Sequence, residues 1–174
     1  MPENLLNEKL LPGNVCFGCG QENPLGLRIA VELDPTDSHR LLGTFEPQEH
    51  MIGFPSITHG GAIYTAMDCM ATWSGMVLRR TKAMWLLRSA TVKYHRPALQ
   101  HNPISLSAVI EEEGEAWEAI LVRIEARNPV GELLADGHFK VIPVAPERLK
   151  ELTGLPDLPG NWIDWLNSHV AGGA

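Results

Sequence analysis

The chain has 174 residues, of which 44% are hydrophobic and 20% charged, as in an ordinary globular protein. Its formal net charge of −7 argues against nucleic acid as the main partner, because binding phosphates needs a basic surface. We find no apolar run long enough to span a membrane and read no signal peptide at residues 1–14. Together with an odd number of cysteines, these features predict a cytoplasmic protein without a membrane partner.

The chain opens with a cysteine pair whose purpose the sequence leaves open. Residues 1–14 predict a short helix or arm, and a knuckle-like turn follows with Cys16 and Cys19 in a C-x-x-C pair. Such a pair supplies half of a zinc site, but a structural zinc needs four ligands, and Cys69 falls within a predicted helix. We therefore interpret these cysteines as residues that pack the turn, and expect no metal and no cofactor.

Two strands and one long helix come next. Apolar residues alternate over residues 27–33 and again over 39–45, which predicts a β-hairpin, whereas residues 46–57 predict irregular chain. Apolar residues then recur at steps of three and four over residues 58–80, with Thr58 at the expected N-cap of a helix.

The start of this helix and one carboxylate within it carry the functional hypothesis. Gly60 and Gly61 at the start let a ligand approach the backbone closely. Asp68, two turns further on, is difficult to explain as a surface residue because its neighbours are Met67, Cys69 and other apolar residues. A group held at the glycines is then a candidate target for the carboxylate.

The rest of the chain predicts a sheet and a tail. Four more strands are expected over residues 85–95, 104–111, 117–126 and 133–144. One long apolar helix among six antiparallel strands must be covered on many sides, so we predict an α+β fold in which a curved antiparallel sheet wraps the helix. We expect this domain to span residues 1–145, and residues 146–174 to form a tail whose short helix, with Trp162 and Trp165, packs on the body.

This order of elements resembles a known family. The succession of two strands, His59-Gly60-Gly61, a helix with Asp68, and four strands including Tyr94-x-Arg96-Pro97 resembles the hotdog fold. Within it, the chain is similar to the phenylacetic-acid-degradation type of acyl-CoA thioesterase over roughly residues 15–143. The opening Cys16-Phe17-x-Cys19-Gly20 and the following Asn23-Pro24-Leu25-Gly26 are also common in that branch.

The resemblance implies hydrolysis of an acyl-CoA thioester. The helix start near Gly60 and Gly61 would donate a backbone N–H to the thioester carbonyl, and Asp68 would act as nucleophile or as base. For His59 we prefer a ring hydrogen bond that orients the loop over a role as base. The resemblance also implies a homodimer with the active site across its interface, and leaves a dimer of dimers open.

Two departures from the family pattern weaken the mechanism but not the fold. The family often has Asn, Gln or His where this chain has Gly53, and His50 is the nearest substitute. A hydroxyl residue often assists from the strand after the helix, where this chain has Leu87; we expect Ser89 and Thr91 to share its face by strand alternation.

Six basic residues are candidates for binding the coenzyme A part of such a substrate. The candidates for holding the phosphates of coenzyme A are Arg79, Arg80, Lys82, Arg88, Lys93 and Arg96.

The first alternative to a thioesterase is a hotdog protein that binds acyl-CoA or lipid without hydrolysing it. A hydratase for enoyl thioesters is weaker, because we see no His and Asp pair of the required kind and interpret His95 as an ordinary residue.

Overall fold

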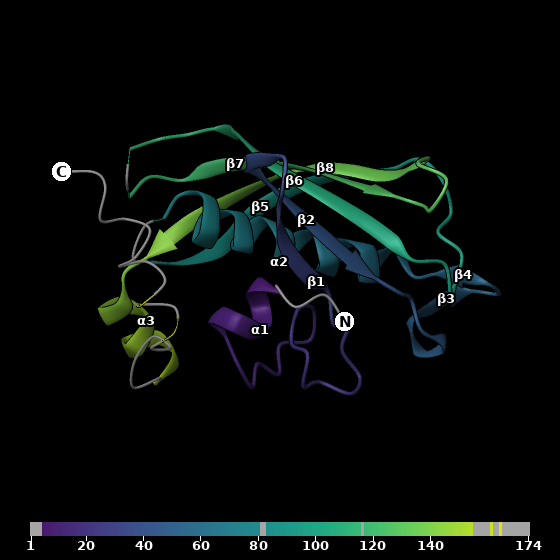
Figure 1. The fold of residues 1–174 in the computed structure, drawn as a ribbon, viewed down its shortest axis with the longest axis horizontal. Helices are drawn as coiled ribbons and strands as arrows, with labels where there is room; N and C mark the ends of the chain where they lie inside the picture. The colour runs from purple at the N-terminus through teal and green to yellow at the C-terminus, as the bar shows by residue number, and fades with distance from the viewer. Residues whose placement is uncertain (1–4, 81–82, 116, 155–160, 162–163, 165–174) are drawn as a thin grey trace.

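In a computed structural model, a six-stranded antiparallel sheet curves over one long helix, α2 (Figure 1). The structure describes residues 5–80, 83–115, 117–154, 161 and 164. The sheet has the order β1-β2-β6-β7-β8-β5, and β3 and β4 form a separate two-stranded sheet. The elements are α1 (Leu6–Leu10), β1 (Ala30–Asp34), β2 (Asp37–Phe45), a 3-10 turn (Glu49–Met51), β3 (Ile52–Phe54), β4 (Ile57–Thr58), α2 (Gly60–Leu78), β5 (Met84–Tyr94), β6 (Ile104–Glu112), β7 (Ile120–Arg127), β8 (Leu133–Val144) and α3 (Pro146–Thr153).

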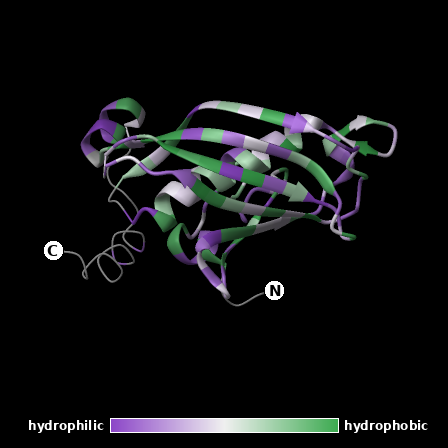
Figure 2. Ribbon diagram, turned by 90° about the horizontal axis from the view of Figure 1, so that it is seen from above, coloured by the Kyte–Doolittle hydropathy of each residue, from purple (hydrophilic) through white to green (hydrophobic). Residues whose placement is uncertain are grey.

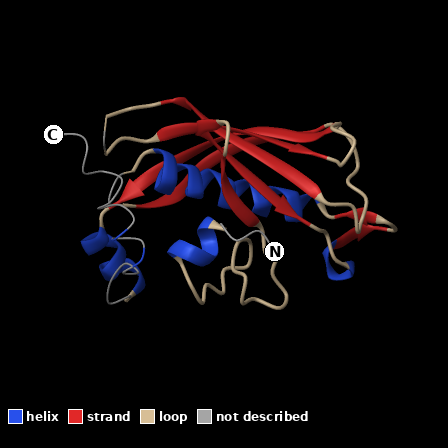
Figure 3. Cartoon of the chain, in the orientation of Figure 1, coloured by secondary structure: helices blue, strands red, loops and turns tan. Residues whose placement is uncertain are grey.

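The predicted α+β architecture is confirmed. Helix α2 packs against one face of the sheet, while α1 and the loop after it lie on the side of α2 away from the sheet (Figures 1 and 3). Seen from above, hydrophobic and hydrophilic residues are interspersed along the strands that cover the helix (Figure 2). Since strand side chains point to the two faces in turn, one face of the sheet is free to bury its apolar residues against α2.

The core lies between this sheet and α2. The helix residues at three- and four-residue steps that the sequence singled out, such as Met67 and Met70, are buried as expected. Trp73 of the helix and Trp85 of β5 are among the largest fully buried side chains. Apolar burial on this scale holds α2 in one orientation, and with it the residues along its length.

The helix begins one residue later than the sequence predicts. The N-cap is His59, whose ring accepts the Gly61 N–H, and not Thr58. Thr58 belongs to β4, where its N–H donates to the Ala98 carbonyl over 2.8 Å. Because this hydrogen bond holds the Thr58 backbone in a strand, Thr58 does not cap the helix. The next residue, His59, has a side chain that can accept a hydrogen bond and is the N-cap.

Strand β5 contains a bulge that overturns one prediction about the site. Its register with β8 shifts between Leu87 and Ser89, so that Arg88 is an extra residue. Leu87 packs on the core, as does Ala90 beyond the bulge, whereas Ser89 and Thr91 are exposed. The prediction that Ser89 and Thr91 share the face of Leu87 is therefore wrong, because alternation holds only where no bulge intervenes.

Other boundaries differ in smaller ways. Strands β3 and β4 occur in residues that predicted irregular chain, and α3 occurs where a Pro-rich tail was expected. Short strands and a helix that begins at a proline give weak periodic signals. Trp162 and Trp165, and with them the predicted tail helix, lie outside the described residues. Within the described part, no helix is both long and apolar enough to cross a membrane.

Candidate active site

The backbone N–H groups in the first turn of α2 differ in whether they have a hydrogen-bond partner. His59 caps the helix: its Nδ1 accepts the Gly61 N–H over 2.8 Å, and its carbonyl accepts the Ala62 N–H over 2.9 Å. Among the described residues, the Gly60 N–H has no hydrogen-bond partner. The ring hydrogen bond expected of His59 is present. Of the two glycines, Gly60 is the one whose N–H is available to a ligand.

A cavity of about 360 Å³ opens at this helix start. Its walls include Gly60 and Ile63 from the helix and Tyr94, Arg96 and Pro97 from the end of β5 and the segment after it. Free N–H groups and the positive end of the helix dipole favour a partly negative oxygen at such a place. The cavity therefore combines apolar walls with polar groups, among them the Gly60 backbone and the side chains of His95 and Arg96.

Tyr94 holds the Gly60 peptide in place. Its hydroxyl donates to the Gly60 carbonyl over 2.9 Å, and the ring lies so close that a Cβ on Gly60 would stand 3.3 Å from it. Burial raises the pKa of Tyr94, so the hydroxyl keeps the proton that this hydrogen bond needs. The contact joins the helix start to the end of β5, although the two are far apart in sequence.

Asp68 lies farther along the same helix and outside the walls of this cavity. Eight residues separate it from Gly60, about 12 Å along the axis at 1.5 Å per residue. Its side chain is half-buried and has no hydrogen-bond or ion-pair partner in the part of the chain that the structure describes. Burial raises the pKa of the Asp68 carboxyl, and the charge of Cys16 raises it further.

Comparisons of sequence return no relatives, whereas comparisons of structure do. No family model and no curated protein matches the sequence. The E. coli PaaI protein from the phenylacetic acid degradation operon superposes with a TM-score of 0.60 at 16% identity, covering 68% of this chain and 81% of PaaI. The chain has the hotdog fold.

Two further hotdog structures agree with this result. A thioesterase from Haemophilus influenzae superposes with a TM-score of 0.61 at 12% identity, covering 68% of this chain and 80% of its own. A Streptococcus mutans protein bound to acetyl CoA gives a TM-score of 0.58 at 12% identity, covering 66% of this chain and 89% of its own. At such low identities the likeness establishes the fold, and the chemistry must be argued from the residues.

The close packing of Gly53 against His59 explains why this position has no side chain. A Cβ added to Gly53 would stand 2.8 Å from the Cα of His59, so no side chain fits there without moving the helix cap. His50, the suggested substitute, has its Nε2 3.1 Å from the Leu25 carbonyl and does not line the cavity at Gly60. His50 therefore does not take the place of the missing side chain at Gly53 in this cavity.

The proposed phosphate-binding residues do not gather at one place. Arg96 lines the cavity and lies 3.5 Å from the Glu132 carboxylate, measured from its Nε. Arg88 and Lys93 are exposed on β5. Arg79 pairs with Glu113 at 3.0 Å, Arg80 is exposed, and Lys82 lies outside the described residues. Of the five that the structure describes, Arg96 alone borders the cavity.

The structure also brings together a pair that sequence reasoning missed. His95, in the cavity wall, contacts the carboxylate of Asp136 on β8 through its Nε2. The pairing of β5 with β8, which sets Lys93 opposite Asp136, is what unites them. No spacing in the sequence signals this contact, because Asp136 lies on β8 and His95 directly follows β5.

The three cysteines form the second cluster that the sequence did not predict. Cys69 was expected to lie apart within the helix, but its Sγ is 4.0 Å from that of Cys16, with Cys19 beside them. Hydrogen bonds from Cys19 and Cys69 lower the pKa of the Cys16 thiol, while the same contact with Cys16 raises the pKa of Cys69. The structure therefore adds Cys69 to the C-x-x-C pair and brings three thiols together, one fewer than the four ligands that a structural zinc takes.

Proposed function

We propose that this protein is an acyl-CoA thioesterase, which hydrolyses an acyl-CoA to the free acid and CoA. The observation that carries the proposal is the half-buried Asp68, which has no hydrogen-bond or ion-pair partner among the described residues, on a helix whose first residue, Gly60, lines a cavity. The hotdog structures of similar shape include one named a thioesterase and one bound to acetyl CoA, which supports a CoA thioester as the ligand.

The helix start is suited to the thioester carbonyl. Attack on this carbonyl places negative charge on its oxygen, and a fixed N–H at the positive end of a helix stabilises that charge. We assign the Gly60 N–H to this role, because the Gly61 N–H is already bound by His59. Tyr94 keeps the Gly60 peptide in one orientation, and Ile63 and Pro97 offer an apolar wall to the acyl group.

Asp68 supplies the chemistry of attack. As a base, its carboxylate would take a proton from water while the water oxygen bonds to the acyl carbon, and the C–S bond then breaks to release CoA as the thiol. As a nucleophile, it would form an acyl anhydride that water hydrolyses to the same products. Because Asp68 has no hydrogen-bond or ion-pair partner among the described residues, its carboxylate is available for either role.

A second copy of the chain is needed to complete this site. Asp68 stands about 12 Å along the helix from Gly60, too far to act on a carbonyl bound there. We propose that Gly60 of one subunit works with Asp68 of another in a homodimer. Strand β5 ends the sheet and offers an unpaired edge through which two sheets can join. A dimer of dimers and a cytoplasmic location stay predictions.

The direct test is release of free thiol from a panel of acyl-CoAs, comparing the wild type with Asp68→Asn. Loss of an acid–base group predicts a fall in kcat of about 10²- to 10⁴-fold. Asp37→Asn, an isosteric change in the β1–β2 hairpin, is the matched control and should keep wild-type turnover. Equal rates for Asp68→Asn and the wild type would refute the role of Asp68.

One observation favours a second function, binding of acyl-CoA without hydrolysis. The bulge at Arg88 turns Ser89 and Thr91 outward, and Gly53 has no side chain, so neither family position supplies a polar group to place the attacking water. Wild-type protein that binds an acyl-CoA in calorimetry but releases no thiol from any of them would establish this alternative over the thioesterase.

A further inference from the structure

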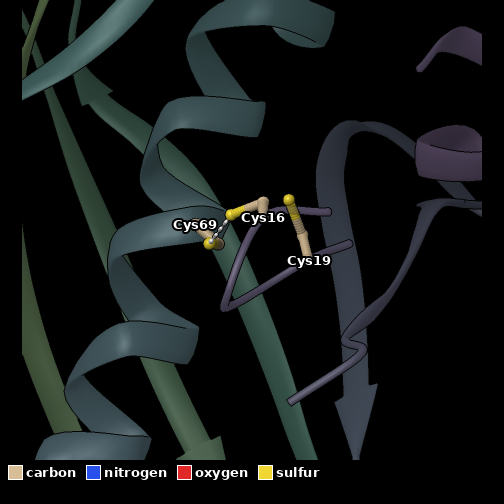
Figure 4. Close-up of side chains that lie close together, drawn as sticks. All are labelled: Cys16, Cys19 and Cys69. Atoms are coloured by element: carbon tan, nitrogen blue, oxygen red, sulfur yellow. Dashed lines mark hydrogen bonds between the residues drawn. The ribbon is translucent and has the colours of Figure 1, made fainter. Parts of the chain in front are cut away.

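Three thiols from two separate segments converge beside the central helix (Figure 4). Cys16 and Cys19 come from the loop that follows α1, and Cys69 comes from the middle of α2. The three Sγ atoms all lie within 4.8 Å of one another, and the pair Cys16 and Cys69 is 4.0 Å apart. All three cysteines are free.

The spacing of the sulfurs matches a metal site. Tetrahedral Zn²⁺ with Zn–S bonds of about 2.3 Å sets its sulfur ligands about 3.8 Å apart. The 4.0 Å between Cys16 and Cys69 is close to that value, and the Cys19 sulfur lies within 4.8 Å of both. A disulfide, by contrast, requires sulfurs at about 2.05 Å, so none of the pairs is bonded.

The chain around the sulfurs is built to hold them together. Asn14 accepts the Cys16 N–H over 2.9 Å and donates through Nδ2 to the Cys19 sulfur over 3.6 Å. A Cβ on Gly18 would stand only 2.3 Å from the Cys69 sulfur, so only glycine lets the loop approach the helix this closely. Such outer contacts orient the ligands of a metal and are a regular part of metal sites.

We propose that Cys16, Cys19 and Cys69 bind one thiophilic divalent metal ion, Zn²⁺, between the loop and α2. Thiolates favour soft or borderline ions over Mg²⁺ and Ca²⁺, which prefer oxygen ligands. The three thiols lose their protons to solvent on binding, and the metal keeps its oxidation state. No other His, Asp or Glu of the described chain joins the cluster, so water from the exposed side of Cys16 fills the fourth position.

The test measures metal binding and does not depend on any enzymatic activity. Wild-type protein, reduced and freed of metal by a chelator, is titrated with Zn²⁺ against a chromogenic competitor, and the complex is weighed by native mass spectrometry. We expect one Zn²⁺ per chain. With Co²⁺ in its place, a sulfur-to-cobalt charge-transfer band should appear in the near ultraviolet.

Variants locate the site. Mutating a residue that only hydrogen-bonds a metal ligand typically lowers metal affinity by ~10- to 100-fold. Cys69→Ser removes a direct ligand, so it should weaken Zn²⁺ binding by more than this. Ser74→Ala, a buried change on the same helix, is the matched control and should bind like the wild type. If Cys69→Ser fails to fold, Cys16→Ser in the exposed loop tests the same site. Absence of Zn²⁺ binding by the fully reduced wild type, or unchanged binding by both cysteine variants, would overturn the proposal.

Discussion

The N-terminal end of α2 and its middle use the same helix in different ways. At the end, the backbone is the functional group: the Gly60 N–H is left open while His59 and Tyr94 fix the peptide around it. In the middle, side chains are the candidate functional groups: the Asp68 carboxyl, and the thiol of Cys69 at the next position of the helix. One end suits binding a carbonyl oxygen, and the other suits proton transfer and metal binding.

The difference follows from which backbone groups are free in each region of the helix. A helix end has free N–H groups that need only a cap to be aimed, whereas the middle has its backbone bonded internally and can act only through side chains. About 12 Å of helix separates the two regions, so they cooperate in one reaction only if two chains meet.

Heterodimers of two variants give the sharpest test of whether the two regions act from different chains. Asp68→Asn and Gly60→Pro should each be nearly inactive alone, but a heterodimer of the two keeps one intact pair of Gly60 and Asp68 across its interface. We therefore expect co-expressed and tag-purified heterodimers to recover up to half of the wild-type thiol release. Heterodimers as inactive as their parents would mean that both groups act within one chain.

Gly60→Pro tests the backbone N–H by itself. Proline is well accepted at the first position of a helix, and the extended His59 before it, with φ −60 and ψ 131, suits a following proline. Removing one donor to the developing oxyanion should lower kcat by about 10²- to 10³-fold. Gly60→Ala, which keeps the N–H, is the control; equal losses in the two would assign the effect to the added Cβ.

Gly18→Ala breaks the contact that holds the loop on the middle of α2. Its Cβ would stand 2.3 Å from the Cys69 sulfur, and such overpacking should lower the free energy of unfolding by about 1–3 kcal/mol. Urea unfolding measures the change. Val15→Ala, at a residue of the same loop that is 67% exposed, should be nearly neutral. A Gly18→Ala protein as stable as that control would contradict the close packing.

Tyr94→Phe sharpens the description of the helix end. It removes the hydrogen bond to the Gly60 carbonyl, which is worth about 0.5–1.5 kcal/mol, so kcat/KM should fall by roughly 2- to 10-fold. Tyr64→Phe is the matched control, because its ring packs on Phe139 and its hydroxyl has no hydrogen bond among the described residues. Equal effects of the two changes would argue against the positioning role of Tyr94.

Ser89→Ala and Thr91→Ala should have the smallest effects. Both side chains are exposed on the face of β5 away from the core, where substitutions usually change stability by less than about 0.5 kcal/mol. Turnover of each variant should equal that of the wild type within experimental error. A tenfold loss of thiol release in either one would show that its hydroxyl takes part in a site formed by two chains.

The sequence predicted most of the fold because most of the fold is periodic. Strand β8 was predicted with its observed bounds, and the apolar stripe of α2 predicted the buried face of the helix. The irregular parts were not predicted. Strands β3 and β4 are too short to show a period. The bulge at Arg88 reverses the faces of β5, and nothing in the composition signals it. Periodicity describes regular chain and is silent where the chain departs from it.

The candidate site divides along the same line. The sequence by itself determined the helix with Gly60 at its start and Asp68 within it, because caps, glycines and apolar spacing are local properties. Only the tertiary structure decided that the Gly61 N–H is taken by His59, that Tyr94 and His95 face the helix start, and that Cys69 meets the cysteine loop. These contacts join segments far apart in the chain, and packing, not local sequence, sets which distant segments touch.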